Sequence, residues 1–243
     1  MRPYFAQARA EIRLALTQGE SLLVTIGIPV IVLVGLSLTK ALPLPGNAKS
    51  ATSFLVPGTM TLAIMATGMV SSAIATGVER SYGVLKRLGT TPLGRPALLA
   101  AKVTSIMVVE IIQLAVLAVI GVLLGWSPSG NWGLLIVSAI LATSGFAGIG
   151  LLMAGTMKSE VIIGAANGIY LILLFIGGII IPITSLPGPI ETFARLLPAA
   201  ALSESLYQAI GVGGSIPMWA WVNLVVWAVV APIAAAATFR WEQ

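Results

Sequence analysis

The stretch VTSIMVVEIIQLAVLAVIGVLL, residues 103–124, decides the fold class of this protein. Apart from Glu110 and Gln113 near its middle, it carries no charged residue and few polar ones. An α-helix needs about 20 predominantly apolar residues to cross a hydrocarbon core that is about 30 Å thick. The stretch is that long, so it predicts a transmembrane helix.

Five further stretches of the chain have the same apolar character. They cover residues 22–38, 54–78, 132–157, 161–182 and 218–239. Of the 243 residues, 58% are hydrophobic and 9% are charged, whereas a soluble domain carries about 25% charged residues. The sequence therefore predicts an all-α membrane protein, in which residues 1–243 form a single domain with six transmembrane helices.

Several residue types that carry chemistry are absent from the chain. It contains no cysteine, histidine or aspartate, and its eight acidic residues are all glutamate. This excludes Ser-His-Asp and Cys-His nucleophiles, histidine-bound zinc and the paired aspartates of membrane proteases. No G-x-x-x-x-G-K-[ST] motif for binding ATP occurs, and no aspartate is present to hold its Mg. We expect no enzyme activity, metal site or cofactor in this chain.

The basic residues are distributed unevenly between the two ends of the predicted spans. With the N-terminus inside, ten of them fall on the inner side and three on the outer side, so both termini are predicted to be cytoplasmic. The inner residues are Arg2, Arg9, Arg13, Arg80, Lys86, Arg87, Arg95, Lys102, Lys158 and Arg240, and the outer ones are Lys40, Lys49 and Arg195. The net charge of +5 therefore indicates orientation in a membrane rather than nucleic-acid binding.

Residues 3–18 predict an amphipathic helix before the first span. At about 100° per residue, apolar side chains share one arc and polar ones share the neighbouring arc. The apolar arc holds Tyr4, Phe5, Ala8, Ile12, Ala15 and Leu16, and the polar arc holds Arg2, Arg9, Arg13, Thr17 and Glu20. We expect residues 1–20 to form an interfacial elbow in the headgroup plane; the alternative is a solvated helix that packs on a partner.

The outer connection, residues 184–217, is too long for a simple turn. Pro187, Pro189 and Pro198 interrupt it, and residues 190–197 and 200–210 have apolar side chains at helical spacing. These two stretches predict short re-entrant helices that dip into the outer leaflet, where their backbone must bond within the protein. The alternative is an exposed loop, but it leaves five apolar side chains in water: Phe193, Leu196, Leu197, Leu202 and Leu206.

The inner connection reads ERSYGVLKRLGTTPLGR, residues 79–95, and is the most charged part of the chain. It predicts a short amphipathic helix that ends at Gly89, before the Thr90-Thr91-Pro92 break. The apolar side chains of such a helix can fill a groove on another protein, while its charges fix the orientation.

Two motifs resemble those of ABC transporter type-2 permeases. Residues 79–95 are similar to the family's cytoplasmic signature, with a Glu-Arg start, a Gly-x-Leu centre and a Thr-Pro end. The stretch GGIIIPITSLPGPIETFARLLPAAALSESL, residues 177–206, resembles the family's outer segment, with a proline closing the fifth span and two Leu-Pro pairs before the sixth. The motifs stand in the expected order, and with the six spans the resemblance covers essentially the whole chain.

The resemblance implies an exporter subunit and assigns roles to particular residues. Residues 79–92 would be the coupling helix, which docks on a separate ATPase subunit that binds ATP and Mg. The docking residues would be Glu79, Arg80, Tyr82, Gly83, Leu85, Lys86, Arg87 and Leu88, although Ser81-Tyr82 departs from the usual family pattern. A second copy or a homologous permease would complete the path, which spans two and five line, with Met65, Met69, Asn167 and Phe175 as candidates.

Glu110 is the one acidic residue well inside a predicted span, and Gln113 lies on nearly the same helix face. Because an ionised carboxylate is costly inside a bilayer, Glu110 should face the bundle interior or an aqueous cavity. It either lies in the translocation path with Gln113, or forms a structural hydrogen bond, for example to Asn167 or Asn223.

The expected substrate is an amphipathic small molecule or a lipid, as in drug and antibiotic exporters of this family in bacterial plasma membranes. A polysaccharide permease of the same family is an alternative. Outside the family, a proton-coupled secondary transporter using Glu110 and a non-transporting scaffold are the rival hypotheses.

Overall fold

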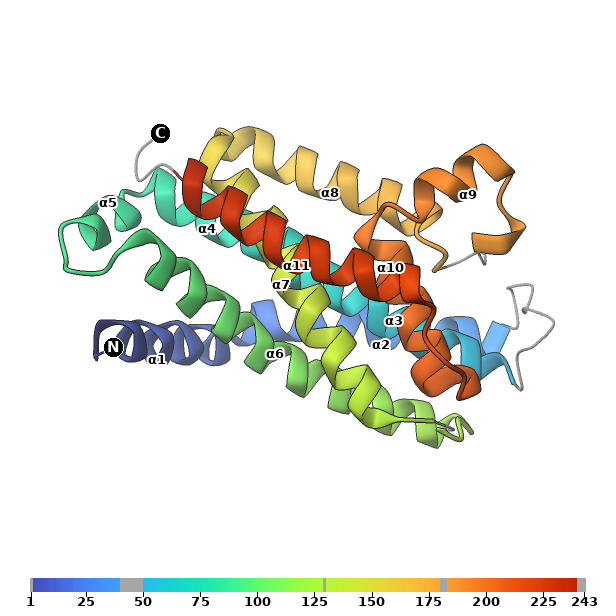
Figure 1. Ribbon diagram of the computed structural model, residues 1–243. Coiled ribbons are helices and arrows are strands. Elements are labelled where there is room, and N and C mark those ends of the chain that lie inside the picture. The colour runs from blue at the N-terminus through green and yellow to red at the C-terminus, as the bar shows by residue number, and fades with distance from the viewer. Residues whose placement is uncertain (1, 40–49, 129, 180–182, 240–243) are drawn as a thin grey trace.

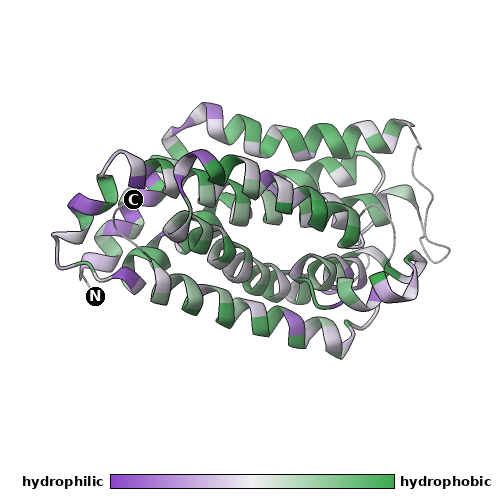
Figure 2. Cartoon of the chain, turned by 90° about the horizontal axis from the view of Figure 1, so that it is seen from above, coloured by the Kyte–Doolittle hydropathy of each residue, from purple (hydrophilic) through white to green (hydrophobic). Residues whose placement is uncertain are grey.

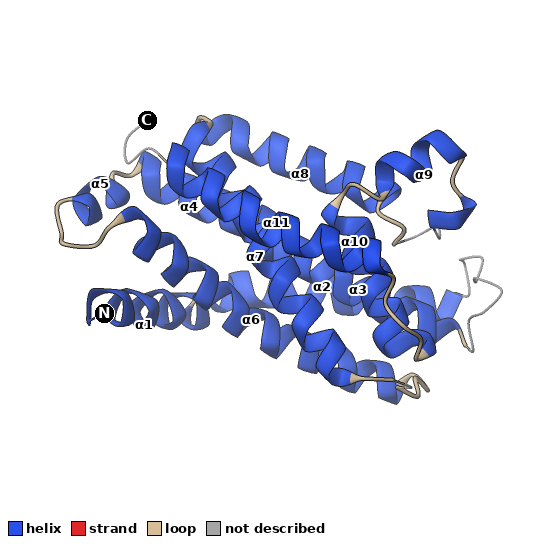
Figure 3. Cartoon of the chain, in the orientation of Figure 1, coloured by secondary structure: helices blue, strands red, loops and turns tan. Residues whose placement is uncertain are grey.

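A computed structural model describes residues 2–39, 50–128, 130–179 and 183–239. The protein is 86% helical, and the described residues contain no strand (Figure 3). Six helices are long and apolar enough to cross a membrane, which confirms the predicted fold class. Lys40, Lys49 and Arg240, which entered the charge argument, lie outside the described residues, as does the end of the fifth predicted span.

The six spans run side by side (Figure 1). Span one is α2, Gly19–Thr39, and span two consists of α3, Ala51–Met65, a π-helical turn η1, Ala66–Ser71, and α4, Ser72–Ser81. The other four are α6, Arg95–Leu123; α7, Trp132–Thr156; α8, Ser159–Ile176; and α11, Met218–Thr238. Hydrophobic residues cover their length, and hydrophilic ones gather toward the end of the bundle where both termini lie (Figure 2).

Span two and α7 form the centre of the bundle. In their most apolar windows 67% and 61% of the residues are buried, compared with at most 28% in the other four spans. The glycines of α7 explain the close packing, because small residues let transmembrane helices approach each other. A Cβ on Gly148 would lie 2.6 Å from the backbone nitrogen of Pro232 in α11. The outward apolar residues of α2, α8 and α11 remain exposed, as lipid-facing residues are.

The observed spans differ in length from the predicted ones, and the third and fifth differ for reasons that the structure shows. The third was predicted over residues 103–124, but α6 begins at Arg95, because its first two turns are an amphipathic extension beyond the apolar stretch. The fifth was predicted over residues 161–182, but α8 ends at Ile176. The chain turns at Gly178, whose φ of 71° favours glycine, and Gly177 packs closely against Ala199.

The N-terminal helix α1, Arg2–Thr17, packs beside the start of α6. Ala8 is buried there, and the hydroxyl groups of Tyr4 and Thr104 are 2.8 Å apart. Phe5 and Leu16, from the predicted apolar arc, stay exposed, as do Arg9 and Arg13 from the polar arc. The contact face is therefore more polar than the arc predicts, and the position of α1 in the headgroup plane stays a prediction.

The outer connection folds into short helices, as its pattern predicts. They are η2, Ile183–Ser185; α9, Gly188–Ala194; α10, Pro198–Leu206; and a second π-helical turn η3, Tyr207–Val212. Leu202 and Leu206 are fully buried, unlike in the exposed-loop alternative, whereas Phe193 and Leu196 stay exposed and Leu197 is half-buried. Asn223 and Trp227 of α11 donate hydrogen bonds to the carbonyls of Arg195 and Leu196. The depth of these helices in a membrane stays a prediction.

Candidate coupling site and polar core

The helix α5, Val84–Gly89, lies at the end of the bundle opposite α9 (Figure 1). It follows α4 after a sharp turn at Gly83, which has a φ of 70° and a conformation that side chains with a Cβ disfavour. Leu85 anchors α5, because it is fully buried in an apolar cluster with residues of α6, α7 and the end of α11. The chain therefore holds α5 against the bundle.

The eight residues expected at the ATPase contact divide into two groups. Leu85 and Arg80 are buried, and the Arg80 guanidinium donates a hydrogen bond to the Met157 carbonyl. Leu88 packs partly against the Leu85 cluster, Glu79 forms an ion pair described below, and Gly83 is half-buried at the turn. Tyr82 is 78% exposed, and Lys86 and Arg87 are exposed too.

The exposed surface of this region contains one residue that the sequence interpretation missed. Val84 is exposed two residues after Tyr82, and Tyr82, Val84, Lys86 and Arg87 form the exposed surface at the start of α5. The helical pattern groups Leu85 with Leu88, but it cannot tell whether a partner or the protein's own bundle covers them. In the structure the bundle covers Leu85, so the surface open to a partner is Tyr82, Val84, Lys86 and Arg87.

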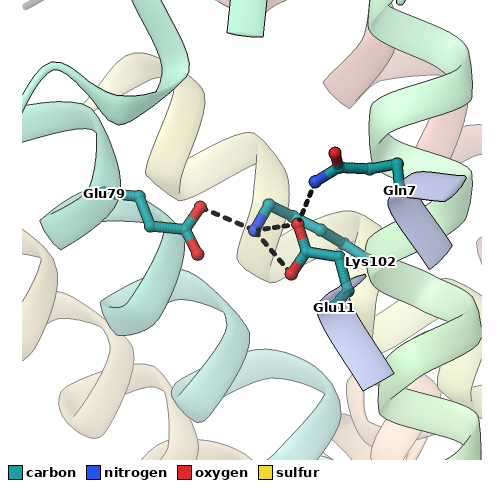
Figure 4. A network of polar contacts seen from close by, with 4 residues as sticks. All are labelled: Gln7, Glu11, Glu79 and Lys102. Carbon is teal, nitrogen blue, oxygen red and sulfur yellow. Dashed lines mark hydrogen bonds and ion pairs between the residues drawn. The ribbon is translucent and has the colours of Figure 1, made fainter. Parts of the chain in front are cut away.

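An ion-pair network joins the two helices on either side of α5 to α1 (Figure 4). Lys102 Nζ of α6 lies 2.6 Å from Glu79 Oε2 of α4 and 3.2 Å from Glu11 Oε1 of α1. Gln7 donates a 2.8 Å hydrogen bond to Glu11 Oε1. The side chains of Lys102, Glu11 and Glu79 are 6%, 12% and 21% exposed, so water screens these pairs little.

Neither Glu11 nor Gln7 was expected to take part in a site, and Lys102 entered only as an orienting charge. A usable signal was present, because Lys102 stands among apolar residues after the start of a span. A charge in that position is expected to pair with another group. Sequence spacing alone could not identify α1 as the source of the partner.

A second polar cluster lies inside the bundle around Glu110 and Gln113 of α6. Glu110 is 3% exposed and Gln113 is fully buried. Gln113 Nε2 donates to the Thr25 carbonyl of α2 at 2.6 Å, and the Thr67 hydroxyl of η1 donates to Gln113 Oε1 at 3.0 Å. Glu110 Oε2 lies within hydrogen-bonding distance of the Thr143 hydroxyl of α7. The cluster therefore connects four helical elements.

The other candidates for a translocation path are not brought together. Met65 and Met69 are fully buried in the core of the chain. Asn167 and Phe175 are exposed on α8, where Asn167 bonds to its own helix at the Ile163 carbonyl. Asn223 bonds to the Arg195 carbonyl. Neither asparagine is the hydrogen-bond partner of Glu110, which is Thr143.

Comparisons with known proteins identify a transporter family and a related permease. Residues 35–238 match the family model for the ABC-2 family transporter protein. One relative is a protein of Bacillus subtilis (strain 168) named "Putative transport permease YvfS", which is 23% identical over 164 residues. The matched region is 64% of this chain and 64% of that relative, so the chain covers a little less than two thirds of its length.

Proposed function

The chain belongs to the ABC-2 family of transporter proteins, and from this premise we propose that it is the membrane-spanning subunit of an ATP-driven exporter. The family is the one that residues 79–95 and 177–206 indicated, which confirms that interpretation. It is a family of transporters, so the chain is a multi-pass membrane protein of a transport system rather than an enzyme. A separate ATPase subunit would bind ATP and Mg and hydrolyse the ATP.

The observation that carries the proposal is the construction of α5. Leu85 fixes the inner side of α5 to the bundle, while Val84 and Arg87 of α5 and Tyr82 just before it are exposed. An aromatic and an arginine on a protruding surface are the residue types that dominate protein–protein contacts. We assign this surface to the ATPase contact.

The ion-pair network links the proposed ATPase contact on α5 to the membrane-spanning helices. The α5 segment joins spans two and three directly, and Lys102 ties α4, α6 and α1 to one another. A displacement of α5 by the ATPase is therefore shared among these three helices rather than absorbed by a loose loop. Lys102 is a positioning residue in this scheme.

The substrate and the assembly follow from the same proposal. A bundle with a mostly apolar interior is suited to an amphipathic small molecule or a lipid, moved outward from the cytoplasm or the inner leaflet. Such exporters include those that confer drug resistance by efflux. A second copy or a homologous permease would complete the path. The family resemblance implies a bacterial plasma membrane, and the bias of Lys and Arg toward the predicted inner side supports cytoplasmic termini.

A proton-driven secondary transporter is the second candidate, and the burial of Glu110 favours it. It needs no ATPase and leaves the exposed face of α5 without a role. Transport that persists after removal of the ATPase would support this second candidate.

The test changes only exposed side chains in and just before α5. Tyr82→Asp combined with Arg87→Glu should abolish the ATPase activity that is expected to co-purify with the wild-type chain. The first change replaces an aromatic ring with a negative charge, and the second reverses a positive charge. Membrane insertion and thermal unfolding should stay unchanged, since neither side chain supports the bundle. Tyr82→Phe with Arg87→Lys is the matched control and should retain the ATPase. Full ATPase recovery with the charge-reversed chain would contradict the assignment of this surface.

Leu85→Asp is a poor test of the same contact. Leu85 is fully buried, so an aspartate there would disturb the end of the bundle. Loss of the ATPase in that variant would not distinguish a lost contact from a damaged permease.

A further inference from the structure

Glu110 is a buried carboxyl group with no basic partner among the described residues. Its Oε1 atom is buried and has no hydrogen-bond partner. On the same helix the nearest basic residue is Lys102, eight residues away or about 12 Å along the axis, and Glu79 and Glu11 already hold it. An ionised carboxylate in this position would have neither a counter-ion nor water, which is a costly arrangement.

The helices packed against α6 supply no charge near Glu110. The elements α3, η1, α7 and α11 contain no ionisable residue. The ionisable residue of α2 is Glu20, at its start, and those of α1 lie around Glu11, beside Lys102. The groups that face Glu110 are therefore neutral ones, from Thr143, Phe146 and Gly68.

The hydrogen count at Thr143 is compatible with a proton on Glu110. The Thr143 hydroxyl oxygen contacts two acceptors, the Ala139 carbonyl at 2.7 Å and Glu110 Oε2. A hydroxyl group has one hydrogen to donate, and the Ala139 carbonyl has none. If Thr143 donates to Ala139, the hydrogen between Thr143 and Glu110 must come from the carboxyl group.

The packing around Glu110 favours a very small ligand. A metal cation needs several oxygen ligands at 2.3–2.6 Å or nearby distances. Glu110 Oε1 instead lies against the glycine of η1, where a Cβ on Gly68 would be 3.6 Å from Oε1 and 3.0 Å from Phe146 Cβ. A proton requires no such ligand shell.

We propose that Glu110 is a proton-binding site, whose carboxyl group carries a proton on Oε2 and donates it in a hydrogen bond to Thr143. The proton comes from water when α6 packs against η1 and α7, and it returns to water if these helices separate and the site becomes hydrated. The proposal holds whether or not an ATPase binds α5, so it can fail independently of the proposed function.

The pH dependence of stability follows from the proton count. At this carboxyl the folded protein binds one proton, whereas the unfolded chain releases it above about pH 4.3. Because the folded state then binds more protons, its stability must fall as the pH rises, by about tenfold in the unfolding constant per pH unit. The neutral Glu110→Gln variant lacks this dependence.

The experiment compares unfolding constants of the full chain in detergent, from about pH 5 to pH 8, by titration with a denaturing detergent. The ratio of the wild-type constant to the Glu110→Gln constant should rise about tenfold per pH unit. In the matched control, Glu160→Gln at the exposed start of α8, the ratio should be constant over this range. A constant or falling ratio for Glu110→Gln would show a carboxylate in the folded state and overturn the proposal.

A second measurement applies if Glu110→Gln does not fold. The infrared C=O stretch of a protonated carboxyl group should be present at pH 7 in wild-type protein labelled at glutamate. Thr143→Val should shift this band, because it removes the acceptor of the carboxyl hydrogen. Absence of the band at pH 7, or a band that Thr143→Val leaves in place, would overturn the proposal.

Discussion

Gly150 determines how closely α7 can lie against the middle of span two. A Cβ at this position would be 2.5 Å from the Met69 carbonyl oxygen and closer still to Ser72 Oγ. Gly145, Gly148 and Gly155 lie instead against α11. In the sequence, four glycines within residues 145–155 form a pattern that is typical of close helix packing, but the pattern does not indicate that they face two different neighbours.

Gly150→Ala should therefore destabilise the protein by about 1–3 kcal/mol, because α7 must move away from η1 to admit the methyl group. Gly164→Ala on α8 is the matched control, since nothing lies within 4 Å of its Cβ position. That variant should stay within about 0.5 kcal/mol of wild type. Equal stabilities of the two variants in a detergent unfolding titration would contradict the packing.

At the scale of helical elements, the sequence predicts the short helices of the inner and outer connections better than it predicts the contacts between helices. The short helices at residues 84–89, 188–194 and 198–206 all follow from proline, glycine and apolar spacing. The contact between α1 and α6 does not, because its ion pair joins Glu11 and Lys102, which lie 91 residues apart in the chain. Local periodicity reports which face is apolar and carries no information on distant ion pairs.

Lys102→Met should destabilise the bundle by about 2–4 kcal/mol, because it leaves two poorly hydrated carboxylates facing each other. The triple variant with Glu11→Gln and Glu79→Gln should recover most of this loss, since it removes the charges that had lost their partner. A double-mutant analysis of unfolding constants measures both effects. No recovery in the triple variant would mean that Lys102 acts through packing instead of charge.

At the scale of the whole molecule, hydropathy predicts the number and order of the spans, and the described residues confirm six. The orientation stays a prediction, because the position of α5 and α9 at opposite ends of the bundle does not say which end is cytoplasmic (Figure 1). The chain's lack of cysteine makes the question accessible to single-cysteine labelling.

A cysteine at Thr192 of α9 should react with a membrane-impermeant maleimide in intact cells, because α9 is expected outside. A cysteine at Thr90, after α5, should react only after the membrane is opened. Both positions are exposed in the structure, so accessibility within the protein does not limit either reaction. The reverse pattern would invert the orientation and remove the ATPase contact from α5.

The π-helical turn η1 determines how span two responds to the deletion of a residue. A π turn accommodates one extra residue, which rotates the helix after it by about 100° relative to an uninterrupted α-helix. Deleting one residue between positions 66 and 71 should therefore convert the π turn to plain α-helix and leave Gly77 and Glu79 facing Ile162 and Lys102. The same deletion within α3, with η1 intact, would turn that face by about 100° and change the angle at which α5 meets the proposed ATPase.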